Sequence, residues 1–227
     1  TKKRYIKKVL GFKKETVQLT HATYYLSTSP GTFDNFIPCA ALDAANNIIY
    51  LLNEIKQKYE LIDLKKDIKH EINIGGFMTN KHVNAYFSKY FKEFKYFVNI
   101  KHKEEFDSFP IDKNIVKYSS DKYGFKLNDE IFLETSSKIS DYAFLIKLTK
   151  DDFKDDNQRI VHILFGGTAL GTLKATEFLL THSKKIYERY GSNHYFFALK
   201  INQIDNSIDF SKENGINDYT SIMFKQT

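Results

Sequence analysis

Apolar residues along the chain alternate between strand-like and helix-like spacing. Alternating or continuous apolar runs predict strands at 16–26, 68–76, 94–100, 141–149 and 159–167. Apolar residues at helical spacing predict three helices. The first covers about 39–59, the second runs from a cap at Thr79 or Asn80 to about 91, and the third covers 168–190 and ends before Gly191. The order of these elements predicts alternating strands and helices for most of the chain.

This order predicts an α/β fold with a Rossmann-like, mostly parallel sheet that carries helices on both faces. The charged, irregular stretch 101–138 is predicted as an insert or flap, in which "YGFKL" and "EIFLE" are candidate hairpin strands. The segments "YFFALKINQI" and "SIDF" are predicted to close the chain as an antiparallel hairpin around Asp205-Asn206. We predict a single ligand-binding domain over 15–227, since 227 residues suit one large domain.

The positive charge of the chain is concentrated at its start. Seven lysine and arginine residues and no acidic residue lie in the first 14 positions, so the net charge of +6 leaves the rest of the chain close to neutral. A nucleic-acid-binding domain carries a basic stripe over its folded surface instead. The pattern therefore disfavours nucleic acid as a partner. It predicts a basic tail or linker at 1–14, with contact to phosphates or an acidic membrane surface as the alternative.

The cysteine count and the hydropathy of the chain indicate its cellular compartment. The single cysteine, Cys39, has no partner for an intramolecular disulfide, which favours a reducing, cytoplasmic compartment. No apolar run reaches the roughly 18 residues of a membrane span, and no secretory leader is found at the start. The chain opens at Thr1 rather than methionine, so we expect a domain of a longer protein.

Two glycine-rich turns between a strand and a helix form the candidate ligand site. The residues are Gly75, Gly76 and Asn80 in "INIGGFMTN" and Gly166, Gly167, Thr168, Gly171 and Thr172 in "ILFGGTALGT". Glycine allows a ligand to approach the backbone closely, and the amides at a helix N-terminus attract phosphate or carboxylate. Ligands of open α/β sheets bind at the carboxyl ends of strands, where both turns are predicted to lie. Each turn also has a purely structural interpretation, as a tight connection without a ligand.

The second turn lacks the standard nucleotide fingerprints. Gly166 and Gly171 fit the glycine spacing of a P-loop, but Thr172 stands where that loop needs lysine, and Lys174 follows two positions late. The G-x-G-x-x-G pattern of dinucleotide-binding folds is absent. An ordinary nucleoside triphosphatase and a standard dinucleotide site are therefore disfavoured.

The stretch "GGTALGTLKATE" resembles a loosened form of the P-G-G-x-G-T-x-x-E motif. That motif marks the lysine-decarboxylase-like (LOG) proteins and the wider SLOG superfamily of nucleotide-binding Rossmannoid domains. The resemblance implies that Gly166-Gly167 and Gly171-Thr172 lie at the phosphates of a nucleotide and that Glu177 serves hydrolysis. The spacer between the two pairs has three residues instead of one, Phe165 replaces the proline, and Glu177 lies two positions late. The resemblance therefore implies nucleotide binding and leaves the hydrolytic chemistry in doubt.

Other candidate residues are scattered along the chain. His21 and the hydroxyl-rich loop at 27–38, with Ser27 and Ser29, follow the first strand and are candidates for the same crevice. Asp141 opens its strand, so it is expected to lie away from the crevice, and Cys39 is interpreted as a small buried hydrophobe. No His, Cys or Asp cluster has the spacing of metal ligands, and no carboxylates pair for acid–base work. We therefore predict no metal and no cofactor and assign no catalytic residue.

Three functions stay open. The first is a sensing domain for a nucleotide or a nucleotide-derived second messenger. It would be the recognition part of a larger bacterial effector of antiviral defence or stress, and a homodimer. The second is an enzyme that cleaves an N-glycosidic bond of a nucleotide or of NAD, with Glu177 or Asp141 as the acid or nucleophile. The third is a protein-interaction domain whose glycines are purely structural.

Overall fold

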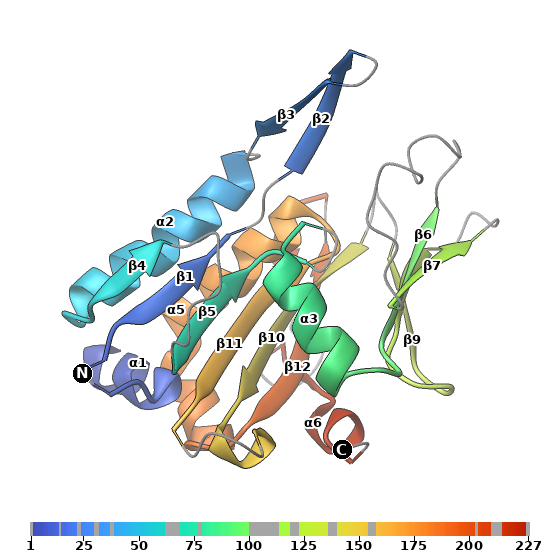
Figure 1. Ribbon diagram of the computed structural model, residues 1–227. Coiled ribbons are helices and arrows are strands. Elements are labelled where there is room, and N and C mark those ends of the chain that lie inside the picture. The colour runs from blue at the N-terminus through green and yellow to red at the C-terminus, as the bar shows by residue number, and fades with distance from the viewer. Residues whose placement is uncertain are drawn as a thin grey trace.

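The core of the protein is one mixed sheet of eight strands. Its strands are β1 (Val17–Thr20), β4 (Tyr59–Leu61), β5 (His70–Ile74), β10 (Ser140–Leu148), β11 (Ile160–Gly166), β12 (Tyr195–Asn202), β13 (Ser207–Ile208) and β14 (Asn217–Asp218). The order is β13-β12-β10-β11-β5-β1-β4, and β14 also pairs with β12 (Figure 1). The computed structural model describes residues 2–13, 15–21, 24–29, 32–36, 39–61, 69–76, 79–99, 114–118, 123–135, 140–153, 158–202, 204–209 and 215–225.

The strand directions divide the sheet into two parts. The four strands β4, β1, β5 and β11 run parallel to one another. On the other side, β10 is antiparallel to both β11 and β12, and β12 is antiparallel to β13 and β14. The predicted α/β, Rossmann-like fold is therefore confirmed, and so is the C-terminal hairpin formed by β12 and β13.

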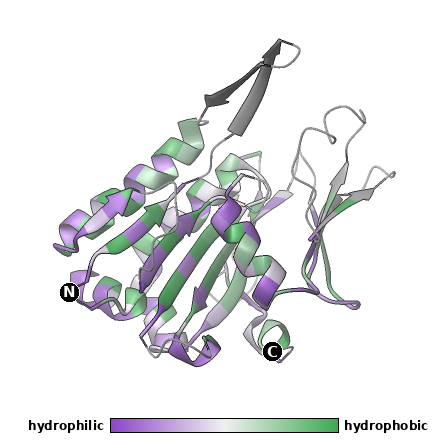
Figure 2. Cartoon of the chain, in the orientation of Figure 1, coloured by the Kyte–Doolittle hydropathy of each residue, from purple (hydrophilic) through white to green (hydrophobic). Residues whose placement is uncertain are grey.

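Helices cover both faces of the sheet, as predicted. The helices α1 (Lys2–Leu10), α2 (Cys39–Glu54) and α5 (Ala169–Tyr190) pack on one face. The helices α3 (Lys81–Tyr90) and α6 (Thr220–Met223) pack on the other. Successive residues of β11 alternate between these two cores: Leu164 packs with α5, and Phe165 packs with α3. In Figure 2 the central strands are largely hydrophobic, as expected for a sheet that is covered on both faces.

Local signals define the helix ends. The side chain of Asn80 accepts hydrogen bonds from the first amides of α3, and the Thr168 side chain accepts one from the amide of Gly171 in α5. These are N-caps, which satisfy amides that have no partner inside the helix. Gly191, with a φ of 61°, ends α5 in the left-handed region that favours glycine. The predicted cap at Asn80 and the predicted end of the last helix at Gly191 are confirmed.

The predicted third strand leaves the central sheet. This strand, β6 (Lys95–Asn99), pairs instead with β7 (Ile115–Tyr118) and β8 (Tyr123–Lys126), and β8 pairs with β9 (Phe132–Thr135). The result is a separate sheet of four strands in the order β7-β6-β8-β9. Much of the predicted insert thus has its own sheet, and "YGFKL" and "EIFLE" form a hairpin in it, as predicted. Phe125 of β8 packs against Phe144 of β10, which joins the two sheets.

The predicted loop at 27–38 is wrong in part. Residues of β2 (Tyr24–Ser29) pair with β3 (Thr32–Phe36) as an antiparallel hairpin, with a register shift between Ser27 and Ser29. Figure 1 shows this hairpin beyond the end of β1, projecting from the edge of the central sheet. The sequence "STSPGT" at the turn suggested a loop because its Ser, Thr, Gly and Pro residues are typical of turns.

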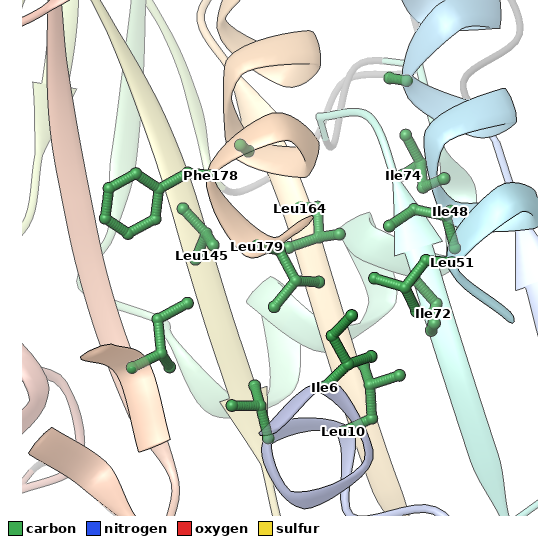
Figure 3. Packing of buried hydrophobic residues seen from close by; sticks show 14 of the residues in the cluster. Ile6, Leu10, Ile48, Leu51, Ile72, Ile74, Leu145, Leu164, Phe178 and Leu179 are labelled. Carbon is green, nitrogen blue, oxygen red and sulfur yellow. The ribbon is translucent and has the colours of Figure 1, made fainter. Parts of the chain in front are cut away.

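The basic segment at the start of the chain is a packed helix, whereas we expected a tail or linker at 1–14. The apolar residues Ile6, Val9 and Leu10 of α1 recur at helical spacing and are buried in the core. Figure 3 shows Ile6 and Leu10 directed toward the sheet, near Leu164 and Ile72. Burying one such side chain contributes about 1.5–3 kcal/mol, so this segment stabilises the fold although it is rich in lysine.

Candidate functional site

The two glycine turns lie side by side at the carboxyl edge of the parallel strands. In the pairing of β5 with β11, Ile74 lies opposite Leu164, so both strands reach their glycines at the same level. The amide of Gly75 donates to the carbonyl of Leu164 at 2.9 Å. A β-carbon built on Gly76 would lie 3.8 Å from the carbonyl oxygen of Gly166. The structure therefore brings the two predicted turns together.

The chain leaves these two strands toward opposite faces of the sheet. After β5 it enters α3 on one face, and after β11 it enters α5 on the other. A crevice opens at such a switch point because the two connections diverge, and ligands of α/β proteins bind there. The carboxyl ends of β5 and β11 thus form the candidate site.

The N-terminus of α5 already holds a carboxylate of the protein itself. The side chain of Asp141 accepts hydrogen bonds from the amides of Gly167 and Thr168, both at 3.1 Å. It also accepts one from the Thr168 hydroxyl at 2.6 Å and one from the amide of Tyr142 at 2.7 Å. Asp141 is fully buried. The anion cradle predicted for a ligand phosphate is therefore filled from within the fold.

This position corrects the expectation that Asp141 lies away from the crevice. That expectation assumed that the strand beginning at Ser140 runs parallel to its neighbour. The two strands are antiparallel, and Ala143 lies opposite Gly166, so the amino end of β10 is next to the carboxyl end of β11. Burial raises the pKa of the Asp141 carboxyl above its ordinary value, although the hydrogen bonds from Thr168, Tyr142 and Gly167 oppose that shift.

The glycines of the α5 turn are needed for this packing. A β-carbon on Gly167 or on Gly171 would lie 2.5 Å from a carboxylate oxygen of Asp141, and one on Gly166 would lie 2.4 Å from the backbone of Gly171. Such distances are too short for any side chain. The Thr172 hydroxyl accepts from the amide of Gly166 at 3.0 Å, which adds a further link between β11 and α5. Each predicted residue of this turn thus has a structural role.

The turn after β5 is held by Asn80, which is also buried. Its side-chain oxygen accepts from the amide of His82 at 3.0 Å and so caps α3. Its amide nitrogen donates to the hydroxyl of Thr20 at 2.9 Å and to the carbonyl of Ile74 at 3.1 Å. Asn80 therefore ties together β1, β5 and α3, and its donors and acceptor are already used by the protein.

The remaining predicted residues are dispersed. His21 directly follows β1 and is half-buried, whereas Ser27 and Ser29 belong to β2 in the projecting hairpin. Glu177 forms an ion pair of 2.8 Å with Lys174 on the surface of α5, about two helical turns beyond the glycines. Cys39 begins α2 and is exposed, which corrects the expectation that it is buried.

A buried ionic group beneath α3 was missed by the sequence analysis. The fully buried carboxylate of Glu71 in β5 pairs with Arg159 at 2.6 Å and accepts a hydrogen bond from the Tyr86 hydroxyl at 2.8 Å. Burial and the charge of Glu71 raise the pKa of Tyr86, so its phenol stays protonated. A glutamate inside the apolar strand "HEINI" was the available signal. The group fixes α3 on the sheet, since its members come from β5, from α3 and from the residue before β11.

The described residues contain neither a membrane-spanning helix nor a cluster of metal ligands. No helix within the described ranges is long and apolar enough to cross a membrane. In the same part of the chain, no group of three His, Cys, Asp or Glu side chains is placed to hold a metal ion. Comparison of the chain with protein-family models, curated proteins and solved structures found no match.

Proposed function

We propose that the protein is a sensing domain that binds a nucleotide-like small molecule at the carboxyl ends of β5 and β11. The observation that carries this proposal is the contact between the two glycine turns at a switch point of the sheet. Gly76 has no side chain, and a β-carbon built there would lie 3.8 Å from the carbonyl oxygen of Gly166. The similarity of "GGTALGTLKATE" to the SLOG motif supports a nucleotide as the ligand class.

The position of Asp141 restricts which part of the ligand meets the α5 turn. A phosphate at this helix N-terminus would compete with a carboxylate that already accepts four hydrogen bonds. Two anionic groups at one set of amides repel each other. We therefore infer that the ligand presents its uncharged sugar or base to this turn and that its phosphates point away from Asp141.

The surroundings of Asp141 and Glu177 favour binding without bond cleavage. The enzyme hypothesis requires one of these two carboxylates as the acid or nucleophile. Asp141 is fully buried and bonded to the backbone, and Glu177 is paired with Lys174 on the outside of α5. A general acid or a nucleophile has to come within hydrogen-bonding reach of the reacting atoms. Asp141 lies at this edge of the sheet, but its oxygens are engaged by the protein, and Glu177 is directed away from the edge to Lys174.

The first experiment is a thermal-shift screen against mononucleotides, dinucleotides and cyclic oligonucleotides. A ligand at one hundred times its Kd stabilises the native state by about 2.7 kcal/mol, which gives a readable shift. A shift with one class, without release of free base over hours, supports the proposal. Release of free base would favour the N-glycosidic enzyme instead, and no shift with any nucleotide would favour the protein-interaction domain.

The matched variants are Gly76→Ala and Gly191→Ala. A methyl group on Gly76 meets its nearest atoms only at 3.8 Å, so the fold tolerates it, but it fills the space between the two turns. We expect the Kd of the ligand to rise at least about tenfold, a loss of about 1.4 kcal/mol. Gly191→Ala makes the same chemical change at the far end of α5 and should leave the Kd unchanged, although its φ of 61° makes alanine strained there. An unchanged Kd for Gly76→Ala would contradict the site.

A further inference from the structure

A hollow lies at the opposite, amino edge of the sheet. It has a volume of about 450 Å³ and lies where the end of α1 meets the turn between α2 and β4. Its lining residues are Lys7, Leu10, Phe12, Lys13, Ile55, Lys56, Gln57 and Lys58. Four of these eight side chains are lysines, and none is acidic. The hollow is therefore a concave and strongly positive surface, which we call the lysine pocket.

The charge of the lysine pocket is not neutralised within the described part of the chain. There, none of its four lysines forms an ion pair with a carboxylate, and the ammonium group of Lys13 donates to the neutral side chain of Gln158. Neighbouring lysines behave differently: Lys3 pairs with Glu54 at 3.0 Å, and Lys69 lies 3.9 Å from Glu15. Four lysines without a carboxylate partner therefore gather around one hollow.

The helix ends at the lysine pocket do not account for this charge. Helices α1 and α2 both end here, and each C-terminus carries a partial negative charge of roughly half a unit. The last carbonyls of α1 are satisfied from inside the sheet, since Lys147 donates to Val9 at 2.8 Å and His162 bonds to Leu10 at 3.0 Å. Four ammonium groups therefore exceed what two helix ends require.

Lys56 occupies a backbone position that favours glycine. Its φ is 56°, in the left-handed region, which costs a residue with a β-carbon roughly 1–2 kcal/mol. The position lies two residues beyond the end of α2, where the amide of Gln57 bonds to the carbonyl of Leu52 at 2.8 Å, and glycine is the usual residue at such a helix end. The lysine at this strained position brings a fourth ammonium group to the pocket, and strained residues of this kind cluster at ligand sites.

We propose that the lysine pocket binds a small phosphate ester of the size of a nucleoside phosphate. The lysines would hold the phosphate, and the apolar wall of Leu10, Phe12 and Ile55 would cover the uncharged part of the ligand. Phe12 is itself fixed, because its ring stacks on His70 at 5.1 Å. A volume of about 450 Å³ lies within the range of small-molecule sites. This site is independent of the one between the glycine turns, since the two lie at opposite edges of the sheet.

The test uses ADP and inorganic pyrophosphate as probes, in isothermal titrations with two double variants of equal charge. Lys56→Gln with Lys58→Gln removes two ammonium groups from the pocket. Lys92→Gln with Lys200→Gln removes two exposed lysines that do not line it. We expect the first pair to raise the Kd of ADP at least about tenfold, because each charge-assisted contact is worth more than a neutral one. The second pair should leave the Kd within about twofold of the wild-type value, since distant exposed charges are screened by salt.

The pyrophosphate arm separates the phosphate from the rest of the ligand. Weaker binding of pyrophosphate than of ADP, lost in the same pocket variant, supports an ester whose uncharged part lies on Phe12. Equal binding of both probes would overturn the role of the apolar wall. Loss of ADP binding in Gly76→Ala, with full binding in the pocket variant, would place ADP at the glycine turns and overturn the lysine pocket. Much tighter binding of a single-stranded oligonucleotide than of ADP, lost in the pocket variant, would overturn the small-molecule assignment in favour of nucleic acid.

Discussion

At each edge of the central sheet, a buried side chain from a strand satisfies the end of a helix. The group is a carboxylate at the positive end of α5 and a lysine with a histidine at the negative end of α1. At the carboxyl edge, the positive N-terminus of α5 meets the buried carboxylate of Asp141. At the amino edge, the negative C-terminus of α1 meets the buried Lys147 and the buried His162, which are neighbours across β10 and β11. In both places a strand supplies the group that satisfies a helix end.

The edges differ in what they leave for a ligand. At the carboxyl edge the amides of the α5 turn are bonded to Asp141, and the proposed site lies beside Gly76, where a β-carbon would meet Gly166 and Phe165 only at 3.8 Å. At the amino edge the helix end is satisfied from inside, and four further lysines surround a hollow of about 450 Å³. A glycine-rich turn is thus a weaker sign of a free anion site than lysines with no carboxylate beside them.

The largest effect is expected for Asp141→Ala. The substitution removes the acceptor that the amides of Gly167, Thr168 and Tyr142 share. We expect the free energy of unfolding to fall by about 3–5 kcal/mol, measured by urea denaturation. The exposed Asp43 on α2 provides the control, and its replacement by alanine should change stability by less than about 0.5 kcal/mol. A loss below about 1 kcal/mol for Asp141→Ala would show that the carboxylate does not hold this turn.

A smaller, pH-dependent effect tests the amino edge. Burial and the nearby Lys147 lower the pKa of His162 from 6.5 to about 3, so the folded protein keeps this imidazole neutral. Between these two values the unfolded chain binds a proton that the folded protein does not bind, and stability therefore falls as the pH decreases through 6.5. We expect His162 to account for a loss of about 2 kcal/mol between pH 8 and pH 5.

The comparison variant for this pH effect is His162→Gln, whose side-chain amide can still donate to the carbonyl of Leu10. Urea denaturation of both proteins from pH 8 to pH 5 gives the two stability profiles. The variant should be less stable at pH 8 but lose about 2 kcal/mol less on acidification than the wild type. Parallel profiles would mean that His162 does not stay neutral in the fold.

The smallest effect is expected for Lys56→Gly, which separates stability from binding at the lysine pocket. Glycine relieves the strain of the left-handed backbone but gains freedom in the unfolded chain, so we expect a net stabilisation of up to about 1 kcal/mol. The same substitution removes one ammonium group and should weaken ADP binding. A differential scanning experiment without and with ADP measures both results. A variant that is more stable and binds ADP as tightly as the wild type would show that the lysine serves no ligand.

The sequence identified those features whose causes are local. The glycine turns follow buried strands, Asn80 and Thr168 precede apolar residues at helical spacing, and Gly191 follows the last one. Each of these signals acts through hydrogen bonds or backbone angles within a few residues. They can therefore be inferred from the neighbouring residues in the sequence. The strands β5, β10 and β11 and both hairpins of the C-terminal half were predictable for the same reason.

Features that depend on distant partners were not predictable in this way. Asp141 reaches the α5 turn only because β10 runs antiparallel to β11, and no local pattern states the direction of a strand. The departure of β6 into a second sheet depends on its pairing with β7 and β8, which lie beyond the next segment of the chain. The burial of Ile6 and Leu10 was hidden by the lysines around them, since charge dominates the composition of that segment.

The sequence by itself determined an α/β protein with two glycine turns after buried strands, because apolar spacing and glycine act within single elements. Only the tertiary structure decided that one turn is filled by Asp141 and that the basic first segment borders a pocket. Both outcomes depend on which residues meet across more than 25 positions of chain, as Asp141 meets Gly167 and Lys147 meets Val9. Strand direction and helix docking set those encounters, and they follow from the packing of the whole sheet.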